Sequence, residues 1–170
     1  DHLLEQAEKL PEDDRIASEK LARAKYHEAA TQYYRLALMS RASREYPEYL
    51  WASVECYRLA NDAYRTVRVV RQFLEDGLPN RRADARLAAG EAELALGNYN
   101  AALESLNLIF RDDAKHPLSY RARIVAHDVY LEQEKFAEAR KLLMENLDHE
   151  ALTPSSLEWR DSLFAMGQML

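Results

Sequence analysis

The chain has 170 residues, of which 48% are hydrophobic and 31% charged, and its formal net charge is −6 at pH 7. This composition is typical of one folded domain and excludes a disordered or loop-rich chain, since there are only four glycines and five prolines. A negative net charge argues against nucleic-acid binding, which needs a basic surface. Because no apolar run approaches the roughly 18–20 residues of a membrane-spanning helix, we expect no direct membrane insertion.

Apolar residues recur at helical spacing along nearly the whole chain, whereas the alternation typical of strands is absent. Short polar breaks separate the helical segments. In chain order, the predicted helices cover residues 12–24, 27–44, 48–60, 63–75, 82–96, 99–111, 118–132, 136–147 and 156–168. The sequence therefore predicts an all-α protein.

The side-chain pattern repeats every 36 or 37 residues. Two columns of small residues and one column of apolar residues follow this period, and prolines fall between successive units. The columns are Ala17, Ser53, Ala89, Ala126; then Ala30, Thr66, Ala102, Ala139; and then Leu38, Leu74, Phe110, Leu147. Such a period indicates stacked pairs of antiparallel helices, because a single pair cannot bury its apolar face alone. Small residues allow two helices to cross closely, and we expect the apolar column to fill the seam between units.

The breaks divide the chain into about four complete units with a partial unit at each end. The complete units are residues 11–46, 47–80, 81–116 and 117–153. Residues 1–10 match the end of an earlier second helix, and residues 154–170 match a first helix without its partner, so we expect a fragment of a longer array. The last helix has an apolar face that could instead form a cap or pair two chains in a homodimer. That face consists of Trp159, Leu163, Met166 and Met169.

The third unit resembles a tetratricopeptide repeat through Gly90 at the helix crossing, the turn from Gly97 to Tyr99, and the small residue Ala102. The first and fourth units repeat parts of this pattern. The matching residues are Ala17, Leu21, Ala30, Tyr34 and Ala37 in the first unit, and Ala126, Tyr130, Phe136, Ala139 and Leu143 in the fourth. The second unit departs most from the pattern. There Val54, Asn61 and Thr66 stand at the positions of Gly90, Gly97 and Ala102, and His127 likewise replaces Gly90 in the fourth unit.

The resemblance implies an α-solenoid, a right-handed superhelix of antiparallel helix pairs, and the long period is similar to variants in bacterial envelope and regulatory proteins. It also implies that the first helices of the units line a concave groove. Placed by register, the groove columns are Arg15, Trp51, Leu87, Ile124; then Glu19, Glu55, Glu91, Asp128; and then Ala22, Arg58, Leu94, Leu131. The apolar members would form a floor beside a line of four carboxylates. An extended or helical peptide with apolar anchors and a Lys or Arg would fit such a groove.

Two alternatives to this groove stay open. The carboxylates could be an ordinary solvated helix face, since exposed acidic residues usually have no further role. Trp51 could be a core residue, since aromatic residues at helical spacing more often belong to the interior than to a binding site.

Catalytic, cofactor and metal-binding motifs are absent from the sequence. The five histidines are scattered, without a pair at i,i+4 or flanking cysteines, and His149 is at most a weak metal ligand. Neighbours His127 and Asp128 should point about 100° apart on a helix, so we expect no acid–base pair. Cys56 is the single cysteine, which excludes an internal disulfide and is expected to be a buried, inert thiol.

We therefore expect a non-enzymatic scaffold that binds a protein or peptide segment without a cofactor, because helical repeats of this kind usually hold partners. The alternative is a peptide-sensing module that regulates an attached output domain.

Overall fold

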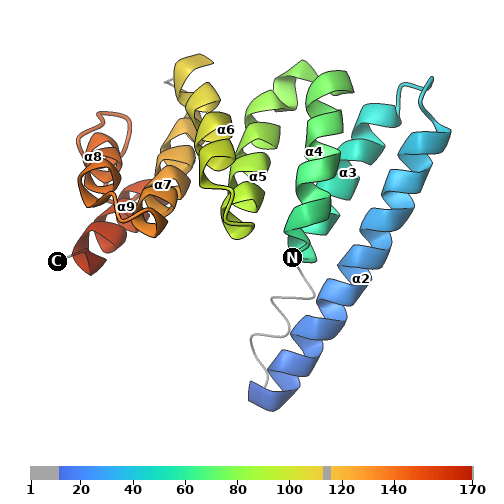
Figure 1. Cartoon of the computed structure of the whole chain (residues 1–170), viewed down its shortest axis with the longest axis horizontal. Helices are drawn as coiled ribbons and strands as arrows, with labels where there is room; N and C mark the ends of the chain where they lie inside the picture. The colour runs from blue at the N-terminus through green and yellow to red at the C-terminus, as the bar shows by residue number, and fades with distance from the viewer. Residues whose placement is uncertain (1–11, 113–115, 170) are drawn as a thin grey trace. The chain divides into compact units, whose positions relative to one another are not determined.

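A computed structural model of the chain describes residues 12–112 and 116–169 (Figure 1). Within these ranges the chain forms α-helices and one short 3-10 segment, and no strand. The prediction of an all-α protein is therefore confirmed. Residues 1–10, which the sequence predicted to be the end of an earlier helix, lie outside the described residues. The chain divides into two compact units, residues 1–82 and residues 83–170.

The first unit contains helices α2 (Glu12–Met39), α3 (Tyr46–Leu59) and α4 (Ala63–Asp76), followed by the 3-10 segment η1 (Pro79–Arg81). In this unit α3 packs against both α2 and α4. The hydroxyl of Ser53 donates a hydrogen bond of 2.9 Å to the carbonyl of Ala30. That contact needs two small side chains, as the repeat pattern predicted, and it fixes the crossing of α2 and α3.

Helix α2 contradicts the prediction of two helices at 12–24 and 27–44, because it continues without a break for 28 residues. Consequently the first predicted unit, residues 11–46, is not a helical hairpin. The reason is local. At the corresponding turns of the other three sequence repeats, a residue adopts a left-handed conformation. These residues are Asn61 (φ 57°), Gly97 (φ 73°) and Glu134 (φ 58°). Lys25 holds this position in the first unit, and the surrounding residues are good helix formers without glycine or proline.

The second unit contains α5 (Arg82–Ala95), α6 (Tyr99–Asp112), α7 (Pro117–Glu132), α8 (Phe136–Leu147) and α9 (Leu157–Gln168). Its core is a cluster of buried side chains contributed by α5, α6 and α7. They are Leu87, Ala102, Leu106, Ile109, Ala122, Val125, Ala126 and Val129. A Cβ atom on Gly90 would lie 2.7 Å from the side chain of Leu106, so the crossing of α5 and α6 requires glycine there.

Apart from the expected break inside α2, the predicted helices agree with the structure to within two residues, except that α2 ends at Met39 rather than at 44. The predicted small residues are buried in the second, third and fourth repeats. In the first repeat Ala30 is buried, but Ala17 is exposed. Leu38 is also 45% exposed, so in the first unit it does not fill a seam as predicted. Both exceptions lie on α2. The exposure of Ala17 follows from the unbroken course of α2, because the N-terminal half of this helix extends beyond the ends of α3 and α4 instead of folding back (Figure 1), whereas Leu38 lies at the C-terminal end of α2.

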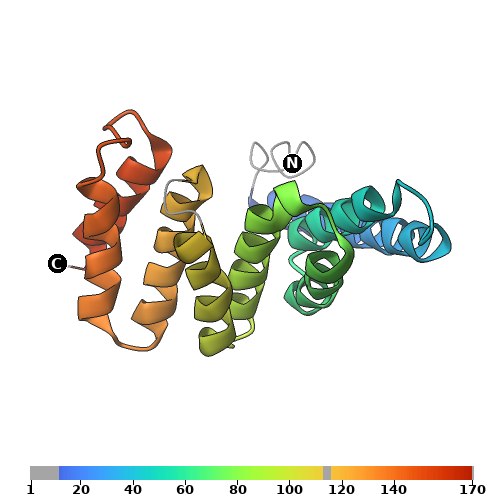
Figure 2. The ribbon, with the colours of Figure 1, turned by 90° about the horizontal axis from the view of Figure 1, so that it is seen from above.

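Helix α9 packs against α7 and α8 (Figure 2), and a buried polar network joins the three helices. The Asn146 side-chain amide on α8 donates to the carbonyl of Tyr120 at 3.0 Å and to the hydroxyl of Ser162 at 3.1 Å. Arg123 donates to the Asn146 amide oxygen at 3.4 Å and to the carboxylate of Glu145 at 3.2 Å. Because Asn146 and Ser162 are fully buried, these hydrogen bonds determine where α9 lies.

The described helices contain none that is both long and apolar enough to cross a lipid bilayer.

Candidate partner-binding face

Leu87 and Ile124, the two members of the first groove column that lie in the second compact unit, are in the interior. Leu87 is 8% exposed and Ile124 is 7% exposed, and Leu87 belongs to the core cluster. The prediction that they form an exposed floor is therefore wrong. Leu94 and Leu131, seven residues or about two turns further along the same helices, are only half-buried. Side chains of neighbouring helices therefore cover Leu87 and Ile124, which the register alone did not reveal.

Trp51 in the first unit is also a core residue, as the alternative interpretation held. It is 5% exposed, and its ring lies 5.2 Å from that of Phe73 on α4. The guanidinium of Arg81 stacks 5.4 Å from the centre of the indole ring. Trp51 therefore packs α3 against α4 and η1, and its side chain is not exposed for contact with a partner.

Ala22 is also buried, at 4% exposed, whereas the charged residues predicted for the groove in the first unit lie on the surface. Glu55 and Arg58 on α3 are exposed. On α2, Glu19 forms ion pairs of 3.8 Å with Arg15 and 3.7 Å with Arg23. These contacts join residues four positions apart on one exposed helix, an arrangement that adds little stability. The predicted carboxylates of this unit are consistent with a solvated helix face.

Three helices of the second unit are joined by a chain of three charges, of which the groove columns included only Glu91. The Arg121 side chain on α7 lies 4.0 Å from Glu91 on α5 and 3.5 Å from Asp161 on α9. Arg121 was missed because its equivalents one and two periods earlier, Asp84 and Glu48, carry the opposite charge. The ion pairs partly neutralise the predicted line of carboxylates.

Asp128 is the carboxylate of this face with the most altered environment. Its side chain is 53% exposed, yet partial desolvation raises its pKa, an effect that nearby His127 and Arg121 oppose and Glu132 reinforces. His127 Nε2 lies 3.8 Å from Asp128 Oδ1, which corrects the expectation that these neighbours point apart. The rotamers turn toward each other because His127 is buried, with Nδ1 3.3 Å from the carbonyl of Ala139.

The described side chains show no group of three or more His, Cys, Asp or Glu placed to hold a metal ion. The ring of His149 instead packs edge-on against Tyr120, with centroids 4.9 Å apart. Cys56 is half-buried rather than fully buried, and desolvation, reinforced by Glu55, raises the pKa of its thiol. A raised pKa disfavours the reactive thiolate at neutral pH.

Packed antiparallel helices with a mixed-charge face on α5, α7 and α9 thus characterise the second unit. No protein-family model, no curated protein and no solved structure matches the chain.

Proposed function

We propose that the chain is a protein-binding scaffold built from tetratricopeptide-like repeats, and that it binds a partner segment on the α5–α7–α9 face of the second unit. The observation that carries the proposal is the charge chain Glu91–Arg121–Asp161, to which three successive first helices contribute one residue each. Regularly spaced helices that present side chains to one side are a recurrent surface for binding an extended or helical segment.

Apolar contacts are available beside the charges. Leu94 follows Glu91 by three residues and Leu131 follows Asp128 by three residues, so each pair shares a helix face. Both leucines are half-buried, which leaves part of each side chain for a partner to cover. The partner chemistry that fits is an apolar anchor followed by a Lys or Arg.

Asp128 is the residue expected to receive that cation. Glu91 and Asp161 already face Arg121, whereas the pKa of Asp128 is raised because its charged form is poorly solvated. A partner ammonium or guanidinium within hydrogen-bond distance would stabilise the charged form and lower the pKa again. Binding at this site should therefore weaken as salt concentration rises.

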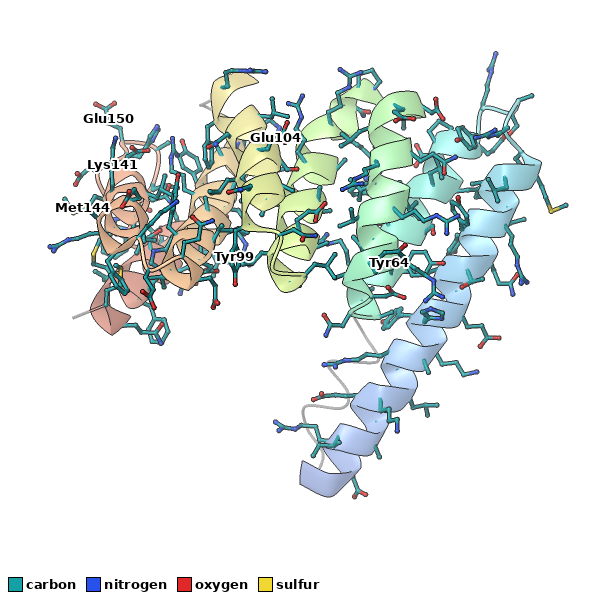
Figure 3. The ribbon with its side chains drawn as sticks, viewed as in Figure 1. Tyr64, Tyr99, Glu104, Lys141, Met144 and Glu150 are labelled. Atoms are coloured by element: carbon teal, nitrogen blue, oxygen red, sulfur yellow. The ribbon has the colours of Figure 1, made fainter. Side chains whose placement is uncertain are left out.

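The proposal is tested by selecting peptides from a random 12-residue display library on the whole chain and measuring the affinity of the selected peptides. We expect apolar and basic residues to be enriched, and Asp128→Lys to weaken binding at least about tenfold by placing like charges together. The matched control is Glu104→Lys, an exposed acidic residue on α6 (Figure 3). Peptides that bind the Asp128→Lys variant unchanged, or that lose affinity equally with the control, would show that this face is not the binding site.

A further inference from the structure

The last helix carries an apolar surface that no described residue covers. Leu157 is 58% exposed, Leu163 is 50% exposed and Phe164 is 68% exposed. Leu157 and Phe164 are seven residues apart and therefore lie on one face of α9, with Arg160 and Asp161 between them. Of the residues that the sequence assigned to the apolar face of this helix, Leu163 is exposed, whereas Trp159, Met166 and Met169 are half-buried against the unit.

The same helix positions are covered in the second, third and fourth repeats, whereas Ala17 of the first repeat is exposed. Leu163 corresponds to Ser53, Ala89 and Ala126, which are all buried in the structure, because these positions recur every 36 or 37 residues. Phe164 corresponds to a second buried set. Its members are Val54, Gly90 and His127. The second helix of the repeat lies over Gly90, whose nearest neighbour is Leu106, and over His127, whose Nδ1 lies 3.3 Å from the carbonyl of Ala139, whereas Ser53 contacts Ala30 on the preceding helix.

A second helix that crosses as closely as α6 crosses α5 at Gly90 does not suit α9, although Val54 and His127 are covered at the position of Phe164 in their own repeats. The crossing at Gly90 is so close that a single added carbon would lie 2.7 Å from Leu106. Leu163 and Phe164 together fill the space that such a crossing needs. The exposed face therefore fits an occupant that packs farther away and accepts large side chains between the two helices.

We propose that this occupant is α9 of a second copy of the chain, packed antiparallel about a two-fold axis. When Leu157 of one copy faces Phe164 of the other, the axis passes between residues 160 and 161. Arg160 of each copy then lies opposite Asp161 of the other. Two-fold symmetry makes every contact occur twice, so one self-complementary face suffices to close a dimer.

The charges on α9 fit this pairing. Arg160 is exposed and forms no ion pair with a described residue. Asp161 lies 3.5 Å from Arg121 of its own chain with 37% of its side chain exposed, which leaves room for a second cation. The antiparallel arrangement places Arg160 of each copy next to Asp161 of the other copy, once on each side of the two-fold axis. A parallel arrangement would place like charges together.

The predicted association is weak. Helix α9 has only 12 residues, so its outer face covers much less than the roughly 800 Å² per partner of a standard stable interface. We therefore expect a monomer–dimer equilibrium visible by sedimentation velocity over a concentration series from about 5 μM to about 500 μM.

The first experiment compares two exposed phenylalanines. Phe164→Glu should shift the equilibrium toward monomer by at least about tenfold in the dissociation constant, because it buries a charge between the helices. Phe136, 59% exposed at the start of α8, provides the control, and Phe136→Glu should leave the equilibrium unchanged. Neither residue belongs to the proposed peptide-binding face, so this result is independent of the test of that function.

The second experiment tests the antiparallel pairing by mixing charge variants. Arg160→Glu alone and Asp161→Arg alone should each be monomeric, because each dimer would contain two like-charge pairs. Mixing the two variants should restore a dimer of the wild-type mass range, since the mixed pair contains two opposite-charge contacts. A wild-type chain that stays monomeric at every concentration would overturn the proposal. So would a dimer that Phe164→Glu leaves intact, or single variants whose mixture does not associate.

Discussion

At the scale of single residues, three turns depend on a left-handed backbone conformation. Gly97 adopts it without strain, whereas Asn61 and Glu134 do so with a side chain. Asparagine is the non-glycine residue that tolerates this conformation best, and glutamate is a poor choice. Glu134 is exposed at its turn, so its presence is a local cost that packing against neighbours does not compensate.

Glu134→Gly should therefore stabilise the chain by about 0.5–1 kcal/mol by relieving the positive φ angle. The measurement is the urea midpoint of unfolding, compared at an unchanged slope. Glu104→Gly serves as the control, because it places glycine inside helix α6 and should destabilise by about 1 kcal/mol. A lower midpoint for Glu134→Gly would show that its side chain makes a contact that outweighs the strain.

Two aspartates have pKa values displaced in opposite directions. Desolvation tends to raise the pKa of Asp62, but hydrogen bonds from the backbone N–H and guanidinium of Arg65, together with His27, keep it below its usual value. Its carboxylate accepts from Arg65 N at 3.0 Å at the start of α4, and His27 Nε2 lies 3.3 Å away. The pKa of Asp128 is raised, mainly by desolvation.

The two displacements predict opposite effects of pH. Charged Asp62 adds stability above the ordinary carboxyl pKa, and this is lost as pH falls through its lowered folded pKa. Charged Asp128 subtracts stability at neutral pH, and the loss disappears as pH falls through its raised pKa. Asp62→Asn should destabilise and Asp128→Asn should stabilise near pH 7, and both differences should shrink near pH 3 in urea unfolding experiments. Equal signs for the two variants at neutral pH would contradict this assignment.

At the scale of elements, the position of α9 depends on Asn146. Its amide joins the backbone of α7 to Ser162 on α9, and all three groups are buried. The hydrophobic pattern of α9 is less decisive, since its larger apolar residues are exposed or half-buried. Helix α9 is therefore attached more by specific hydrogen bonds than by apolar burial.

Asn146→Ala should destabilise the chain by about 1–3 kcal/mol, because it leaves the carbonyl of Tyr120 and the hydroxyl oxygen of Ser162 without this donor. Amide hydrogen exchange should accelerate in α9 more than in α6. Asn107→Ala, at an exposed position on α6, should change stability by less than about 0.5 kcal/mol. Unchanged exchange in α9 would mean that apolar contacts alone hold the helix.

At the scale of the whole molecule, the two proposed binding surfaces both belong to the second unit. One is the mixed-charge face of α5, α7 and α9, and the other is the outer side of α9 around Phe164. The first unit contributes a buried Trp51 and, on α2, exposed Ile16 and Leu21 near Glu19, whose ion pairs join residues of that one helix rather than of three. The burial of Trp51, Leu87 and Ile124 thus differs from the exposed apolar floor of the three-column groove that the resemblance implied.

Most of the element boundaries were predictable from local chemistry. Asn61 and Gly97 mark turns, and Pro117 begins a helix where its missing N–H costs nothing. The small residues of the repeat, such as Ala102 and Ala139, were correctly assigned to buried crossings. The break expected at Lys25 was wrong because it came from the period alone, without a residue that ends a helix.

The sequence by itself determined the helical class, the period and the positions of close helix crossings, because these depend on spacing along one chain. Only the tertiary structure decided that Leu87, Ile124 and Trp51 are covered, that Arg121 joins Glu91 to Asp161, and that Phe164 is exposed. The physical reason is that burial and ion pairing depend on side chains from other helices. A column drawn along one helix indicates the direction of a side chain but not what lies in front of it.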